Sequence, residues 1–162
     1  MTFSTLKLYC NVRAMRNRNF FLAAFLLSAS LAAQAGPPDG TPVGVWKTID
    51  DISHQPRGLI RLFERDGEIF GRIEASLDPK EAHEVCSKCG GELKDKPVVG
   101  MLVLRHMKKH GNEYSGGYIL DPDTGWEYRC RFTLIDGGTK MLIRGFLGFS
   151  LLGRSQTWYR EP

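Results

Sequence analysis

A two-residue alternation of apolar and polar side chains is the feature that most restricts the fold of this chain. The alternation is clearest over residues 126–134, where apolar and aromatic side chains occupy every second position and the positions between them are Glu127, Arg129, Arg131 and Thr133. Successive side chains of a β-strand point to opposite faces. The pattern therefore predicts a strand with one buried and one solvated face.

The same alternation recurs from residue 43 onward, between segments rich in Asp and Gly that suit tight turns. We place eight strands, over residues 43–50, 58–64, 68–74, 98–106, 113–120, 126–134, 141–146 and 155–160. Only residues 79–85 could form a helical turn, with Asp78 as its N-cap. Many short antiparallel strands in one small domain favour a closed barrel, because closure removes exposed edges. The predicted fold class is all-β, a single small antiparallel barrel of about eight strands.

The first 35 residues differ in kind from the rest of the chain. Four basic residues precede an uncharged stretch at 20–33, which ends in Ala33-Gln34-Ala35. A basic segment, a short apolar segment and an Ala-x-Ala site are typical of a secretory signal peptide, so we expect one over residues 1–35 with cleavage after Ala35. The apolar stretch is shorter than the roughly 20 residues that cross a bilayer. We therefore expect a periplasmic or secreted protein with no integral membrane segment after cleavage.

Removal of this leader changes the charge of the chain. Four of the 22 Lys and Arg residues precede residue 36, whereas all 18 Asp and Glu residues follow it, so the expected mature chain has 18 residues of each sign. It carries no basic run interleaved with aromatics, which argues against nucleic acid as a partner. Residues 36–42, with three prolines and two glycines, predict a flexible lead-in, and residues 43–162 form the expected barrel domain.

Three cysteines remain after the predicted cleavage, Cys86, Cys89 and Cys130. Cys130 alternates with aromatic residues and is expected in the core, which favours a disulfide between Cys86 and Cys89. Other arrangements stay open at this stage. They are a bridge from either of these cysteines to Cys130, a metal site that includes His83, and a thiol-disulfide catalyst.

The two ends of the barrel domain carry a second indication. Gly44-Val45-Trp46 opens the first predicted strand, and Trp158-Tyr159-Arg160 closes the last. This arrangement resembles lipocalin-like barrels, in which a G-x-W tryptophan of the first strand packs under a basic side chain from the last. The resemblance implies that Trp46 and Arg160 close one end of the barrel. The alternative is that Trp46 and Trp158 are two unrelated core tryptophans.

A wider resemblance covers almost the whole expected mature chain. Its segments are GVWKT (44–48), GRI (71–73), CSKC (86–89), GGYILDPDTG (116–125), RGFLG (144–148) and LGRSQTW (152–158). As an ordered set they are similar to the bacterial domain-of-unknown-function family DUF2147. The resemblance implies a small exported β-barrel and brings no catalytic residue with it.

Strand alternation also sends several polar side chains toward the predicted interior. Asp50 is in phase with Trp46, Arg144 with Leu142 and Phe146, and Gln156 with Trp158. Tyr118 and Tyr128 are expected on the inward faces of their own strands. A buried guanidinium needs an acid, an anion or water. Arg144 therefore either pairs with Asp50 or Asp121 in a closed network, or binds the acidic head of a small ligand.

We therefore expect a monomeric, exported, non-catalytic barrel that binds a small amphipathic or acidic ligand. The candidate ligand-binding residues are Asp50, Tyr118, Tyr128, Arg144 and Gln156, and we expect no metal and no cofactor. Two alternatives belong to other classes. One is an envelope protein-interaction module that uses the loop at residues 75–97, and the other is a periplasmic enzyme with an acid-base site built from the inward polar residues.

Overall fold

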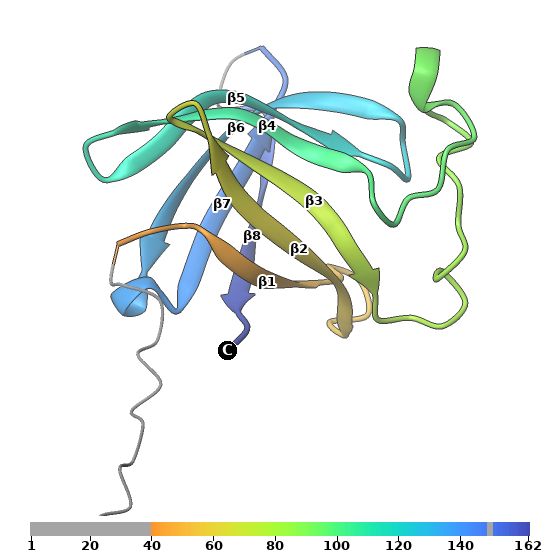
Figure 1. The fold of residues 1–162 in the computed structure, drawn as a ribbon, viewed down its shortest axis with the longest axis horizontal. Coiled ribbons are helices and arrows are strands. Elements are labelled where there is room, and N and C mark those ends of the chain that lie inside the picture. Colours follow the sequence, from red (N-terminus) through yellow and green to blue (C-terminus); the bar gives the residue numbers. More distant parts are fainter. Residues whose placement is uncertain (1–39, 149–150) are drawn as a thin grey trace, which may run out of the picture. The chain divides into compact units, whose positions relative to one another are not determined.

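The computed structural model describes residues 40–148 and 151–162. Both the predicted signal peptide, 1–35, and the first four residues of the predicted lead-in lie outside this part of the chain. Within it, every strand pairs antiparallel with the next one along the chain and β1 pairs with β8, which closes the barrel (Figure 1). The strands are β1 Gly44–Ile49, β2 Pro56–Arg65, β3 Glu68–Ser76, β4 Leu102–His110, β5 Glu113–Asp121, β6 Trp126–Ile135, β7 Lys140–Phe146 and β8 Gly153–Arg160.

The eight-stranded antiparallel barrel confirms the predicted fold class, with two local corrections. Strand β4 begins and ends four residues later than predicted, because residues 98–101 belong to the preceding loop although they include apolar side chains. The segment 79–85 forms turns and no helix. Asp78 nevertheless accepts a hydrogen bond from the Lys80 backbone N–H at 2.9 Å, as a capping residue would. Among the described residues, the helices are short 3₁₀ turns and none could span a membrane.

One end of the barrel is filled by large apolar side chains. Trp46, Met107 and Met141 are fully inaccessible to solvent, and the rings of Tyr114 and Phe132 stack with their centroids 4.7 Å apart. Cys130 lies on the same face of β6 as Phe132 and is a buried free thiol. Burial raises the pKa of this thiol to about 12, because the charged thiolate is poorly solvated in the core.

Arg160 covers this packed end. The guanidinium carbon of Arg160 lies 4.3 Å from the centre of the Trp46 ring. Its nitrogens donate to the carbonyl oxygens of Gly138, Val43 and Thr41, at 2.7, 2.9 and 2.5 Å. These carbonyls lie before β1 and in the β6–β7 connection, so a single side chain of β8 joins three segments. The structure thus has the Trp46–Arg160 arrangement that the resemblance to lipocalin-like barrels implies.

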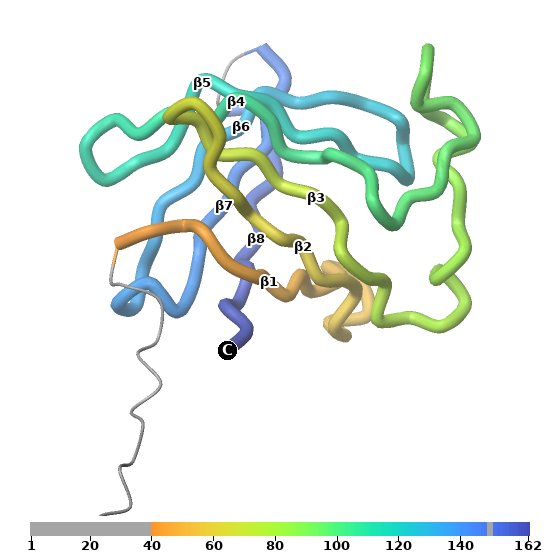
Figure 2. The backbone as a smooth tube through the Cα atoms, viewed as in Figure 1, coloured from red at the N-terminus to blue at the C-terminus, as the bar shows by residue number. Residues whose placement is uncertain are grey.

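A long connection, residues 77–101, joins β3 to β4 and extends away from the strands (Figure 2). It contains the 3₁₀ turn η1, Gly91–Leu93, and an isolated bridge between Val85 and Pro97. The Sγ atoms of Cys86 and Cys89 are bonded to each other, which is the pairing that the sequence favours. Both cysteines are buried, so the disulfide forms a small core for a segment with little regular structure.

Candidate functional site

A cavity of about 420 Å³ lies inside the barrel, away from the end that Arg160 covers. It is bounded by the last residues of β1, β3, β5 and β7 and by the first residues of β2, β4, β6 and β8. In an up-and-down barrel these strand ends all meet at one end, which explains why segments far apart in sequence line one space. The volume falls in the range of small-molecule sites, about 300–1,000 Å³.

The inner wall of this cavity is mainly aliphatic. Side chains that belong to the hydrophobic core or pack against it contribute from six different strands, and they include Ile60, Ile73, Val103, Ile119, Ile143 and Trp158. Because each strand alternates, the inward positions next to the packed core are also the positions that face the cavity. Two polar groups interrupt the wall, Tyr128 and Gln156. The Gln156 side-chain oxygen accepts a hydrogen bond from Trp158 Nε1 at 3.3 Å.

The outer part of the cavity is polar, and it includes an arginine that is hydrogen-bonded to two acids. Arg57, near the start of β2, donates two hydrogen bonds to the carboxylate of Asp123, at 2.5 and 2.8 Å, and one to Glu81 at 3.2 Å. The hydrogen bonds that Arg57 donates to Asp123 are the main reason why the Arg57 pKa lies above its ordinary value. This network joins β2, the long connection and the β5–β6 turn at the mouth of the cavity, and its members line the cavity.

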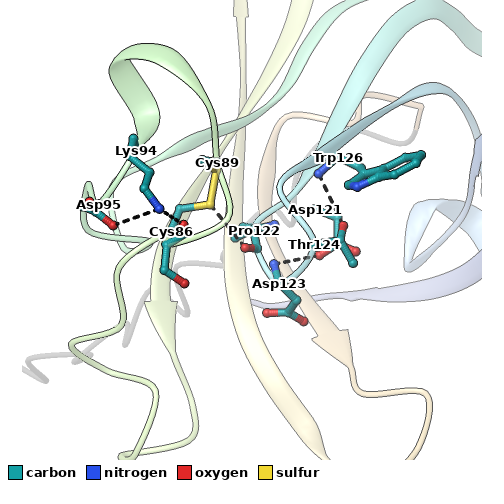
Figure 3. The surroundings of a disulfide bond; sticks show 10 residues. Cys86, Cys89, Lys94, Asp95, Asp121, Pro122, Asp123, Thr124 and Trp126 are labelled. Atoms are coloured by element: carbon teal, nitrogen blue, oxygen red, sulfur yellow. Dashed lines mark hydrogen bonds and ion pairs between the residues drawn. A yellow bond between two sulfur atoms is a disulfide. The ribbon is translucent and has the colours of Figure 1, made fainter.

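The disulfide segment packs directly against the same β5–β6 turn (Figure 3). Cys86 Sγ lies 3.2 Å from the Pro122 carbonyl oxygen. Gly125 has φ +72°, and a Cβ atom at this position would lie 2.1 Å from the Lys88 carbonyl oxygen. Such an approach is open only to glycine, so the turn and the segment are matched to each other. The contact holds the long connection, which contributes Glu81, Glu84 and Val98, along one side of the cavity.

Three of the five predicted ligand-binding residues line the cavity, Asp50, Tyr128 and Gln156. Asp50 lies at the mouth, where its carboxylate accepts hydrogen bonds from the Ile52 and Ser53 backbone N–H groups, at 3.1 and 2.7 Å, and from the Ser53 hydroxyl at 2.8 Å. The hydrogen bond from the Ser53 backbone is the largest cause of a lowered Asp50 pKa. Asp50 therefore orders the β1–β2 turn and stays ionised at neutral pH.

Two predicted inward positions, Tyr118 and Arg144, are wrong. Tyr118 is 39% exposed and does not line the cavity. A bulge in β5 between Tyr114 and Gly117 shifts the alternation of inward and outward side chains, so Tyr118 faces outward. Arg144 also lies outside the lining, since the inward side chains of β7 are those of Met141 and Ile143. It donates hydrogen bonds to the Ser155 hydroxyl at 2.9 Å and to the Leu151 carbonyl oxygen at 3.3 Å.

The residues that the sequence reasoning missed are Arg57, Glu81 and Asp123. No local pattern marks them, because they come from three segments that only the closed barrel brings together. Asp123 belongs to the Asp-Pro-Asp-Thr-Gly turn, where aspartate is expected to bind backbone amides. That role belongs to Asp121, whose carboxylate accepts from the Asp123 N–H at 3.0 Å, and this leaves the Asp123 carboxylate for Arg57.

Comparison with solved structures gives one match whose description names a fold family. The protein HP1028 from Helicobacter pylori, described as belonging to the lipocalin family, superposes with a TM-score of 0.66 at 17% sequence identity. The match covers 74% of this chain and 82% of that protein. At this level of identity the likeness shows a common fold, a lipocalin-like barrel. No match was found among curated proteins.

The sequence itself matches a family model over residues 44–160. That range begins with the first residue of β1 and ends with the last residue of β8, so the model covers the complete barrel. The family is described as an uncharacterized protein conserved in bacteria. The chain therefore belongs to the DUF2147 family.

Proposed function

We propose that this protein is an exported, non-catalytic binding protein that holds the apolar part of a small amphipathic molecule inside its barrel. The cavity of about 420 Å³ is the observation that carries this proposal. Its aliphatic inner wall favours a hydrocarbon chain or ring, since burial of apolar surface is worth about 25 cal/mol per Å². Its polar mouth gives a head group access to water and to charged side chains.

The apolar side chains around the mouth agree with this function. Leu147 and Leu152 line the cavity and are 43% and 74% exposed, so they extend the aliphatic wall toward solvent. The two residues are adjacent, because the Leu147 backbone N–H donates to the Leu152 carbonyl oxygen at 3.2 Å, and contiguous exposed apolar surface is typical of binding sites. A bound amphiphile whose chain leaves the cavity between them would cover part of this surface.

Export is a second element of the proposal. The basic segment, the apolar stretch and the Ala33-Gln34-Ala35 motif support a signal peptide, and the Cys86–Cys89 disulfide is compatible with an oxidising compartment. N-terminal sequencing of protein from the periplasmic fraction should give a chain that begins at Gly36. A chain that keeps the apolar stretch at residues 20–33 would contradict export by this route.

A cavity-filling pair of variants tests the binding function. Ile73→Trp adds an indole group inside the cavity, whereas Leu142→Trp adds the same group on the outer face of β7, where Leu142 is 44% exposed. The neutral fluorescent probe N-phenyl-1-naphthylamine should bind the wild type and be displaced by decyl maltoside. Leu142→Trp should keep this binding and Ile73→Trp should lose most of it. Equal binding by both folded variants would contradict the cavity as the site.

A further inference from the structure

We infer that the head group of the bound amphiphile carries a positive charge. This inference rests on the proposed binding function and names the chemical class of its ligand. It starts from the ionisable side chains that line the cavity. Five are acidic and two are basic, and the described lining has neither Lys nor His. The acids are Asp50, Glu81, Glu84, Asp121 and Asp123, and the bases are Arg57 and Arg154. The described lining therefore has three more negative than positive charges.

Both arginines are already engaged by carboxylates. Arg57 is held by Asp123 and Glu81, so this group of three keeps one net negative charge. Arg154 pairs with Asp51, which lies next to the lining in the β1–β2 turn. An anionic head would have to break one of these pairs and then approach the remaining acids. The anion anchor expected from the sequence was Arg144, which does not line the cavity.

The remaining carboxylates favour a cation. The Asp50 carboxylate accepts hydrogen bonds from Ser53, which are the main cause of its lowered pKa, and the Asp121 carboxylate accepts one from the Asp123 backbone N–H. Among the described residues neither carboxylate forms an ion pair, and Arg57 acts on Asp50 only as a weaker, longer-range charge. Glu84 lies in the long connection on another side of the mouth. Clefts lined by one sign of charge concentrate the opposite charge.

The inner wall and the mouth take different parts of the ligand. The wall, which includes Tyr128 and Trp158, receives the apolar chain, whereas the head group lies at the mouth beside the carboxylates. A quaternary or primary ammonium on a single alkyl chain therefore fits the mouth and the wall together. An amphiphile with a sulfate or carboxylate head fits only the wall.

The experiment compares three amphiphiles that share a decyl chain and differ in the head group, each below its micellar concentration. They are decyltrimethylammonium, decyl maltoside and decyl sulfate, with binding measured by calorimetry and the fold checked by near-ultraviolet circular dichroism. We expect decyltrimethylammonium to bind on the order of tenfold more tightly than decyl sulfate at low salt. This ratio should fall as sodium chloride is raised, because salt screens the exposed carboxylates.

Two matched variants locate the effect. Glu84→Gln should lower the ratio of cation to sulfate affinity about threefold. Glu64→Gln, an exposed glutamate near the β2–β3 turn that does not line the cavity, should leave the ratio unchanged. Equal binding of the three amphiphiles, or tighter binding of the sulfate, would overturn the inference and leave the binding function in place. Binding of none of them would overturn the proposed function itself.

Discussion

Replacement of Arg160 by methionine tests the packed end of the barrel. The change keeps much of the side-chain length and removes the charge together with three hydrogen bonds to carbonyl oxygens and the contact with the Trp46 ring. A hydrogen bond to a charged group contributes about 1.5–3 kcal/mol and an exposed cation–π contact about 0.5–1 kcal/mol. These values give an upper bound, because the site is part-buried and water can replace some of the donors.

We therefore expect Arg160→Met to lower the free energy of unfolding by about 2–4 kcal/mol. For a barrel of this size that corresponds to a fall in melting temperature on the order of 10 °C. Arg160→Lys, which keeps the charge but not the planar fork, should give a smaller loss. Denaturant unfolding followed by tryptophan fluorescence measures the effect, and decyl maltoside affinity should stay unchanged because the cavity is elsewhere.

Arg61→Met is the matched control. Arg61 forms an ion pair with Glu74 at 2.7 Å on the barrel surface, and its side chain is 54% exposed, so its loss should cost less than about 1 kcal/mol. A loss in Arg160→Met no larger than that in Arg61→Met would refute the view that Arg160 closes the barrel. A loss of ligand affinity in Arg160→Met would show that the packed end and the cavity are coupled.

Three further predictions concern other parts of the structure. Gly125→Ala should lower the free energy of unfolding by about 2–3 kcal/mol, measured by thermal unfolding, because a positive φ is combined with a clash against the Lys88 carbonyl. Gly67→Ala is the control and should cost about 1 kcal/mol, because Gly67 has φ +76° and open space around it. Burial raises the Cys130 pKa from about 9 to about 12, so the thiol of the unfolded chain ionises first as the pH rises. The wild type should therefore lose stability between pH 9 and 12. In denaturant unfolding across that range, Cys130→Ala should not show this loss. Arg144→Met should leave probe binding unchanged in a fluorescence titration, since the side chain lies outside the cavity lining.

Strand number, closure and the inward face of β6 could be predicted because the evidence for them is local. In β6 the alternation is clean, and Cys130 and Phe132 are buried as expected. The turns that separate the strands carry Asp and Gly, so the number of strands follows from sequence alone. The start of β4 could not be predicted from the sequence. Val98 is apolar because it packs against the core from the long connection, and not because it belongs to a strand.

The inward faces of β5 and β7 needed information from neighbouring strands. In β5, Tyr114 pairs with Phe132 and Gly117 with Cys130, so two residues of β5, 115 and 116, lie opposite the single residue Arg131 of β6. This bulge turns Tyr118 outward, and no simple alternation can reveal it.

In β7 apolar residues occupy both faces of the strand, so alternation alone does not show which face points into the barrel. The pairing with β6 shows it, because Ile143 lies opposite the buried Phe132 and cross-strand partners share a face. Leu142 pairs with Thr133 and faces out with it. Neither strand alternation nor strand pairing could predict the Arg57 network, because it depends on three segments that meet only in the closed barrel.

Nuclear Overhauser contacts between a bound amphiphile and methyl groups of the protein show whether a ligand enters the barrel. Isoleucine-methyl labelling and decyl maltoside, which has no charge, make the test independent of the head group. We expect contacts from the decyl chain to the methyl groups of Ile73, Ile119 and Ile143, which line the cavity. We expect none to Ile135, which is 37% exposed and outside the lining. Contacts confined to Ile135 and other surface methyl groups, or no contacts at concentrations that saturate binding, would contradict a ligand inside the barrel.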